Sequence, residues 1–204
     1  MRHLASFYTL FFALLLSLGF TSAAQAQRDT PSAAVKTTVD AILAVLRKPD
    51  FTFARDRSAI SATVTEAFDA TAMAQSVLST NWRSASKEQQ DVFRDLLLQT
   101  IENTYIDRIK AYTNESVEFR GENTTGDRST VQTVIVTAKG NVPVNYKLRQ
   151  RSDGWFVYDV EVENVSMVSS YRDTYRDIVR RSGMNGLLEQ MRVKLAQLKA
   201  AQGA

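Results

Sequence analysis

The chain contains no cysteine, and its single histidine is His3, close to the amino terminus. Without cysteine the fold has no disulfide bonds, and no thiol is available for a lipid anchor. Without histidine after residue 3, catalytic groups of the Ser-His-Asp and Cys-His kinds are excluded, and a zinc or haem site would lack its usual ligands. These absences therefore exclude catalysis of these two kinds and disfavour zinc and haem in the folded part of the chain.

The sequence also lacks the patterns typical of nucleotide and nucleic-acid binding. It has no glycine-rich phosphate loop, internal repeat or low-complexity linker. The chain holds 25 Lys and Arg against 22 Asp and Glu, and residues 1–26 contribute one Arg and no acid, so 24 against 22 remain after them. A net charge of +2 gives no electrostatic reason to expect a nucleic-acid partner. The 204 residues less these 26 leave 178, enough for one domain with a hydrophobic core.

Residues 1–26 have the pattern of an export signal. Arg2 provides the positive charge, an apolar run extends over residues 4–20, and Ala24-Gln25-Ala26 is a small-x-small cleavage site. The run is short for a transmembrane span and is interrupted by polar residues. We therefore expect cleavage near Ala26 and a single folded domain, residues 27–204, outside the inner membrane.

The first half of the mature chain has the apolar spacing of helices. Helices are predicted over residues 32–47, 54–68, 69–79 and 87–112, the second of them less regular. Ser86 and Gln89 form a capping box at the start of the longest helix. Its apolar stripe includes Leu97, Ile101 and Tyr105, and in most proteins such a stripe is part of the core.

From residue 116 the apolar period changes from about 3.6 to 2, which predicts strands. Four strands are expected, over residues 116–120, 130–138, 142–151 and 155–162. Because the connections are short, we expect an antiparallel meander. In the second strand Val134 and Val136 lie on the face opposite Ile135; in the third, Tyr146 and Leu148 point inward.

The strand over 155–162 is apolar on both sides, so both of its faces should be covered. Trp155 and Val157 point one way and Tyr158 the other, although a bulge would put Trp155 and Tyr158 on the same side. Asp159 and Glu161 alternate with apolar neighbours, as solvent-facing residues of a strand do.

The loop after this strand is apolar at Val165, Met167 and Val168, where loops are normally polar. It is either additional core or the lip of an apolar cavity. Two helices follow, separated near Gly183. Helices, an antiparallel sheet and closing helices make an α+β domain, and a curled sheet packed on helices would enclose a pocket.

Three classes of function are compatible with these residues. A small α+β enzyme of the isomerase or dehydratase kind would use acids such as Asp159 and tyrosines such as Tyr146, but the acids are expected to be exposed. A binding module would hold a hydrophobic ligand in the pocket. An exported adaptor without a ligand would bind its partner through the apolar loop or through the basic segment of residues 172–199, which has seven Lys and Arg and three acids.

An ordered set of motifs resembles the MlaC family, the toluene-tolerance or Mla-type periplasmic phospholipid-binding proteins, over residues 35–195. The set comprises Phe68-Asp69 with Met73, Leu78 with Trp82, Ser86-x-x-Gln89, Leu97 with Tyr105, VPVNYKL, GWFVYDV, NVSMVSSYR and RRSGMNGLL. The chain departs from many relatives at Asn164, where they have glycine. The resemblance implies a nuclear transport factor 2-like or cystatin-like α+β fold, with about four strands curled over helices and no catalysis.

The resemblance also implies a ligand and partners. A periplasmic carrier of this family holds phospholipid acyl chains in an apolar cavity. It shuttles lipid between an outer-membrane Mla lipoprotein complex and an inner-membrane Mla ABC transporter complex, which maintains outer-membrane asymmetry. No cofactor, metal or nucleic acid is implied. The residues expected to line the cavity are Leu97, Ile101, Tyr105, Val134, Val136, Tyr146, Leu148, Trp155, Val157, Tyr158, Val165 and Met167.

Overall fold

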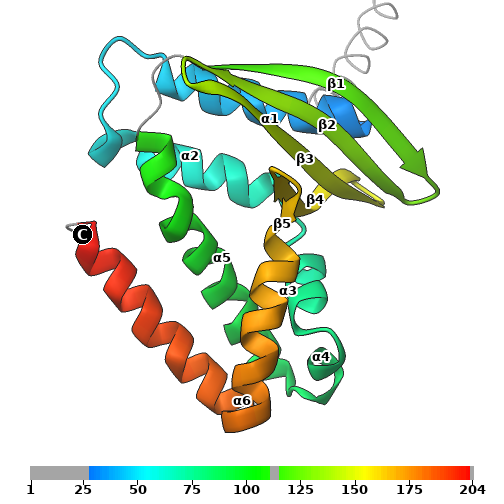
Figure 1. Cartoon of the computed structure of the whole chain (residues 1–204), viewed down its shortest axis with the longest axis vertical. Helices are drawn as coiled ribbons and strands as arrows, with labels where there is room; N and C mark the ends of the chain where they lie inside the picture. Colours follow the sequence, from blue (N-terminus) through cyan, green and yellow to red (C-terminus); the bar gives the residue numbers. More distant parts are fainter. Residues whose placement is uncertain (1–27, 111–114, 203–204) are drawn as a thin grey trace, which may run out of the picture.

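Helices precede and follow one antiparallel sheet, in a computed structural model that describes residues 28–110 and 115–202, with residues 106–110 described by their backbone alone (Figure 1). In chain order the elements are α1 (Pro31–Leu46), α2 (Phe53–Ala67), α3 (Ala70–Leu78), α4 (Thr80–Ser84), α5 (Lys87–Lys110), β1 (Ser116–Thr125), β2 (Arg128–Thr137), β3 (Gly140–Arg151), β4 (Gly154–Val162), β5 (Val165–Ser166) and α6 (Met167–Ala201). The predicted α+β class is confirmed. The predicted export signal lies outside the described residues.

The sheet has the sequential order β1-β2-β3-β4-β5, so the predicted meander is confirmed with a short fifth strand added. β1 is five residues longer than predicted, because it continues past a bulge between Phe119 and Gly121. The polar residues that follow the bulge lie exposed on the outermost strand. Their polarity gave no strand signal, because an edge strand can face solvent on both sides.

A two-residue turn joins β4 to β5. Glu163 and Asn164 both have positive φ, 52° and 65°, and hairpin turns of two residues favour this backbone conformation. Asparagine tolerates a positive φ better than most residues, so Asn164 can replace glycine here. Val165 therefore belongs to a strand, paired with Val162, and not to a loop.

The helix boundaries follow from local chemistry. The predicted capping box is confirmed at α5: the Gln89 amide donates to Ser86 Oγ at 3.1 Å, and the Ser86 amide donates to Gln89 Oε1 at 3.0 Å. α6 begins at Met167, where the Ser169 amide donates to Ser166 Oγ at 3.0 Å. At Gly183, φ is 66°, and α6 bends there into two arms, as Figure 1 shows. Predicting two helices separated at this glycine was therefore correct in substance.

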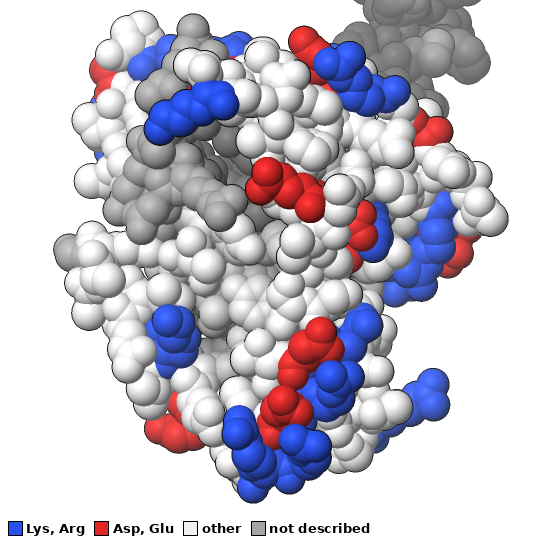
Figure 2. Space-filling model, viewed as in Figure 1, with Lys and Arg blue, Asp and Glu red and all other residues white. Residues whose placement is uncertain are grey.

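Charges alternate along the first arm of α6 (Figure 2). Arg176 pairs with Asp173 at 3.0 Å, and Arg180 pairs with Asp177 at 3.2 Å. These pairs leave the basic surplus of the region in place, since the seven Lys and Arg between residues 172 and 199 still exceed the three acids by four. Among the described residues, no helix is long and apolar enough to cross a membrane.

Two hydrophobic clusters form the core. One lies among α3, α5 and α6 and includes Phe93, Leu97 and Leu187; the other lies between α1 and the inner face of the sheet. Phe68 and Ile101 pack against both clusters. The two clusters therefore approach each other beneath α2.

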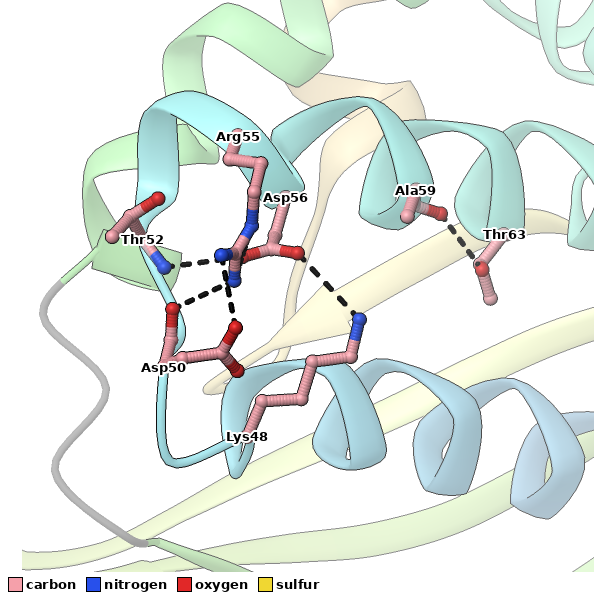
Figure 3. Close-up of polar contacts among 7 residues, drawn as sticks. All are labelled: Lys48, Asp50, Thr52, Arg55, Asp56, Ala59 and Thr63. Carbon is pink, nitrogen blue, oxygen red and sulfur yellow. Dashed lines mark hydrogen bonds and ion pairs between the residues drawn. The ribbon is translucent and has the colours of Figure 1, made fainter.

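α2 is fastened at both ends. At its amino end the buried Asp56 carboxylate accepts from the Thr52 amide at 3.1 Å and from Arg55 Nη2 at 2.7 Å, with Lys48 Nζ at 3.5 Å (Figure 3). These bonds, that from Arg55 foremost, lower the pKa of Asp56 to about 2. At the other end the Asp69 amide donates to the Val157 carbonyl at 2.8 Å, which joins the chain to β4.

Candidate functional site

An apolar cavity of about 560 Å³ lies between α1, α2, α5 and the inner face of the sheet. It takes the place of direct packing between the central parts of these elements. Its wall consists of Val35, Thr38, Val39, Ile42, Ile60, Ser61, Val64, Thr65, Ala67, Phe68, Met73, Asp95, Leu98, Gln99, Ile101, Glu102, Tyr105, Tyr146, Val157, Val160, Val162 and Met167.

Helical and strand periodicity place these side chains on the cavity. On α1, Val35, Val39 and Ile42 recur at i, i+4 and i+7, which is one face of a helix. On the sheet, Tyr146 of β3 lies opposite Val160 of β4, so both point to the same side. Apolar surface thus reaches the cavity from both layers.

A bulge in β4 completes the sheet wall. Lys147 pairs with Asp159 whereas Leu148 pairs with Val157, so Tyr158 is the extra residue. As a result Val157 and Val160 lie on the same side although three positions separate them. The Tyr158 ring instead lies under the Arg128 guanidinium, 4.9 Å from it.

Five of the predicted site residues come together on the cavity wall: Ile101, Tyr105, Tyr146, Val157 and Met167. Leu97, Leu148 and Trp155 are buried in the two hydrophobic clusters and are not part of the wall. Tyr158 lies at the bulge. Contact of any of these residues with a ligand remains a prediction.

Val134 and Val136 lie on the outer face of the sheet, which corrects the facing assigned to them from sequence. Val131 and Thr133 are buried and Ile135 packs against the sheet cluster, so the odd-numbered positions of β2 point inward. The apolar pattern of β2 gave the wrong facing because Thr133, which points inward, is polar. Its hydroxyl is accommodated in the core by donating to the Val144 carbonyl at 2.9 Å.

Val165 is also outside the cavity wall, with 61% of its surface exposed. Its partner across the β4–β5 pair, Val162, does line the cavity. Val165 therefore lies one strand beyond the wall, at the edge of the sheet.

Asp159 is not solvent-facing, contrary to the expectation from strand alternation. It is 3% exposed and accepts hydrogen bonds from Ser166 Oγ at 2.7 Å and from the Val168 amide at 3.0 Å. Lys147 pairs with both Asp159 and Glu161. Asp159 therefore fixes β4 to the first turn of α6, and it is not among the residues that line the cavity.

Sequence reasoning did not assign the contributions of α1 and α2. Val39 and Ile42 were visible as a helical stripe, but a stripe that faces a cavity has the same spacing as one that faces core. The lining residues of α2 alternate apolar with polar, as in Ser61, Val64 and Thr65. That mixture weakened the helix signal itself.

One titratable group of the wall, the phenol of Tyr146, has a strongly shifted pKa. Burial raises the pKa of Tyr146 to about 12, and a hydrogen bond with Thr133 offsets only part of this rise. The phenol is therefore neutral at physiological pH. Within the described part of the chain, no group of three or more Asp, Glu, His or Cys is placed to hold a metal ion.

A curled antiparallel sheet packed on helices around an apolar cavity defines an α+β domain of the kind that can enclose an apolar molecule. A sequence model of the MlaC protein matches residues 36–193, and the chain belongs to this family. The predicted family is thus confirmed.

Two known proteins illustrate the relationship. The chain is 25% identical to the intermembrane phospholipid transport system binding protein MlaC of Haemophilus influenzae (strain ATCC 51907 / DSM 11121 / KW20 / Rd), over 59% of each chain. The match thus spans less than two thirds of that relative. The fold is similar to that of a phospholipid-binding protein from Ralstonia solanacearum, solved in complex with a phospholipid. The TM-score is 0.75 at 22% identity, covering 86% of this chain and 98% of that one.

Proposed function

We propose that this protein binds a phospholipid with its acyl chains in the cavity, and that it carries the lipid between membranes. The observation that carries the proposal is the cavity itself, about 560 Å³ with a predominantly apolar wall, in a chain of the MlaC family. The names of the two similar proteins support a phospholipid as the ligand.

The energetics of acyl chains suit an enclosed carrier. Two chains carry about 30 methylene groups, and each costs about 0.8 kcal/mol to expose to water. Release of the whole lipid into water would therefore cost on the order of 20 kcal/mol. Transfer is expected to occur while the carrier is docked on a membrane complex.

The cellular setting of the proposal is the periplasm. The export pattern of residues 1–26 supports it, as does the intermembrane transport system in the relative's name. The partners we propose are an outer-membrane Mla lipoprotein complex and an inner-membrane Mla ABC transporter complex. No catalysis is proposed, since the two similar proteins are named for phospholipid binding and transport.

Native mass spectrometry of the protein purified from its own compartment, followed by organic extraction, tests this function. We expect a bound mass that matches glycerophospholipid, recovered in the extract at about one molecule per chain. A spectrum with only the mass of the polypeptide, together with an extract free of lipid, would contradict the carrier and favour an adaptor.

A further inference from the structure

α2 is attached to the rest of the fold differently from the other helices around the cavity. Among the described residues, neither hydrophobic cluster includes a side chain of Phe53–Ala67, whereas both α1 and α5 contribute buried residues to the clusters. Ile60, the large apolar side chain that α2 buries, is 1% exposed and lines the cavity. An element with few buried apolar contacts opens at a lower free energy than the rest of a fold. α2 can therefore move with less loss of packing than the other helices of the wall.

Arg57, in the second turn of α2, bonds to two other helices. Its Nη2 lies 3.2 Å from Glu102 Oε1 and donates to Asn103 Oδ1 at 2.9 Å, both on α5. Its Nη1 donates at 3.4 Å to Oε1 of Gln202, directly after the end of α6. The acceptors are themselves fixed, because the buried Asn103 donates to the Gln99 carbonyl at 2.7 Å and its own carbonyl accepts from Gln202 Nε2 at 2.6 Å. One side chain thus holds α2 against both α5 and the end of α6.

The cavity wall reaches solvent beside these contacts. Thr65 of α2 and Asp95 of α5 are exposed, whereas every other lining residue is buried or half-buried. Glu102 lines the cavity two turns after Asp95, and Arg57 pairs with it there. We call this boundary between the two helices, marked by Thr65, Asp95 and Glu102, the α2–α5 seam. It is where the contents of the cavity come closest to solvent.

We infer that α2 is the gate of the cavity and that Arg57 is the latch that holds it closed, so that lipid enters and leaves through the α2–α5 seam. This inference rests on the proposed function. The amino end of α2 is tied to the segment after α1 by Asp56, whose carboxylate lies 3.5 Å from Lys48 Nζ. The chain after its other end is tied to β4 by the Asp69 amide. Turning about these two ends moves α2 away from α5 and widens the seam, and both hydrophobic clusters stay intact.

Loss of the latch should speed opening without changing how much lipid is bound at equilibrium. Arg57 is not among the residues that line the cavity, so it acts on the lipid through the position of α2. Its bonds stabilise the closed cavity whether the cavity is empty or filled, and their removal raises the open population of both states equally. The lost bonds belong to a charged group that is 24% exposed. We therefore expect a change of about tenfold in the open population.

Access to a buried thiol measures this opening. Because the chain has no cysteine, Val35→Cys places a single thiol on the cavity wall, at a position on α1 that is 2% exposed. Its reaction with a water-soluble maleimide is timed on samples of equal lipid content. We expect the reaction to be about tenfold faster with Arg57→Ala. Arg57→Lys should be intermediate, because an ammonium group lacks the fork that reaches several acceptors at once, and it provides the test if Arg57→Ala does not fold.

Two further readouts separate a gate from general loosening. Amide hydrogen exchange should become faster in α2 and keep its wild-type rate in α3 and α6. Transfer of a fluorescent phosphatidylethanolamine from the loaded protein to excess phosphatidylglycerol vesicles should also be faster with Arg57→Ala. The amount of lipid bound, measured by native mass spectrometry, should stay at the wild-type level.

The matched control is Arg94→Ala. Arg94 is 30% exposed and pairs at 2.9 Å with both Asp91 and Asp95, so it resembles Arg57 in exposure and pairing, but all three residues belong to α5. It should keep the wild-type rates. Equal thiol reaction in Arg57→Ala and wild type overturns this inference alone, as does an equal acceleration by Arg94→Ala. Faster thiol reaction with unchanged lipid transfer overturns the seam as the lipid route. Absence of lipid from the wild type overturns the proposed function itself.

Discussion

Replacing Val64 with glutamate should empty the cavity while the fold remains. Val64 is a half-buried residue of α2 whose side chain lines the cavity. With acyl chains beside it, a carboxylate must lose its hydration or take up a proton. To be neutral at pH 7, the new carboxyl group must take up a proton at a pH about 2.7 units above its ordinary pKa, and this protonation costs about 3.7 kcal/mol. That corresponds to a loss of affinity of several hundredfold.

The lipid-free protein should tolerate the same change. Val64 lies between Ser61 and Thr65 on α2, and Thr65 is exposed, so the new carboxylate can reach water there. We expect a loss of stability of only about 1 kcal/mol. The assay combines a thermal melt with the lipid content measured by native mass spectrometry. Val193→Glu is the control, because Val193 is an exposed valine, 50% accessible, on the second arm of α6.

Two outcomes would refute the reasoning. The first is a Val64→Glu protein that keeps the wild-type amount of lipid, since the side chain could not then be beside acyl chains. The second is unfolding of both Val64→Glu and Val39→Glu, the equivalent change on α1. Joint unfolding would mean that this region is close-packed core and not a wall around removable ligand.

Three further predictions concern residues outside the wall. Val165→Glu should keep both lipid and melting temperature, because this side chain is already exposed; loss of lipid would place it at the cavity mouth. Asp56→Asn should lower stability to urea at pH 6 but not near pH 2. The fold holds the pKa of Asp56 at about 2, so the ionised carboxylate stabilises the folded state above pH 4. This contribution is lost as the pH falls through 2. An equal loss at both pH values would contradict this ion-pair account. Asp159→Asn should destabilise the fold by about 2 kcal/mol, as it weakens buried hydrogen bonds, whereas Glu161→Gln should change stability by less than about 1 kcal/mol. Urea unfolding of both variants checks this, and equal effects would contradict it.

The secondary structure was largely predictable, because the residues that carry its signals act locally. Ser86 and Gln89 form the predicted capping box, and Gly183 divides α6 where glycine was expected to end a helix. The turn between β4 and β5 was less visible. Asn164 there adopts a positive φ that sequence alone associates with glycine, so Val165 looked like part of a loop.

The side of the sheet to which a strand residue points was predictable only where apolar and polar residues alternate regularly. β3 alternates without exception, and Tyr146 and Leu148 point inward as expected. In β2 the buried Thr133 interrupts the apolar series, and in β4 the bulge at Tyr158 shifts the alternation by one residue. A bulge depends on pairing with the neighbouring strand, so the residues of β4 alone do not reveal it.

No single segment of the sequence distinguishes residues that face the core from residues that face the cavity. Leu97 and Ile101 are one turn apart on the same stripe of α5, yet Leu97 is fully buried among α3, α5 and α6 whereas Ile101 lines the cavity. Leu97 is covered by side chains of α3 and α6, whereas Ile101, one turn later, faces the space between α5, α2 and the sheet. α2 is held over this space by polar contacts: Asp56 pairs with Lys48 after α1 at 3.5 Å, and Arg57 bonds to Glu102 and Asn103 of α5. The Asp69 amide fastens the chain after α2 to β4. The position of α2 over the space that would hold a ligand is thus set by polar contacts, and apolar periodicity carries no information about them.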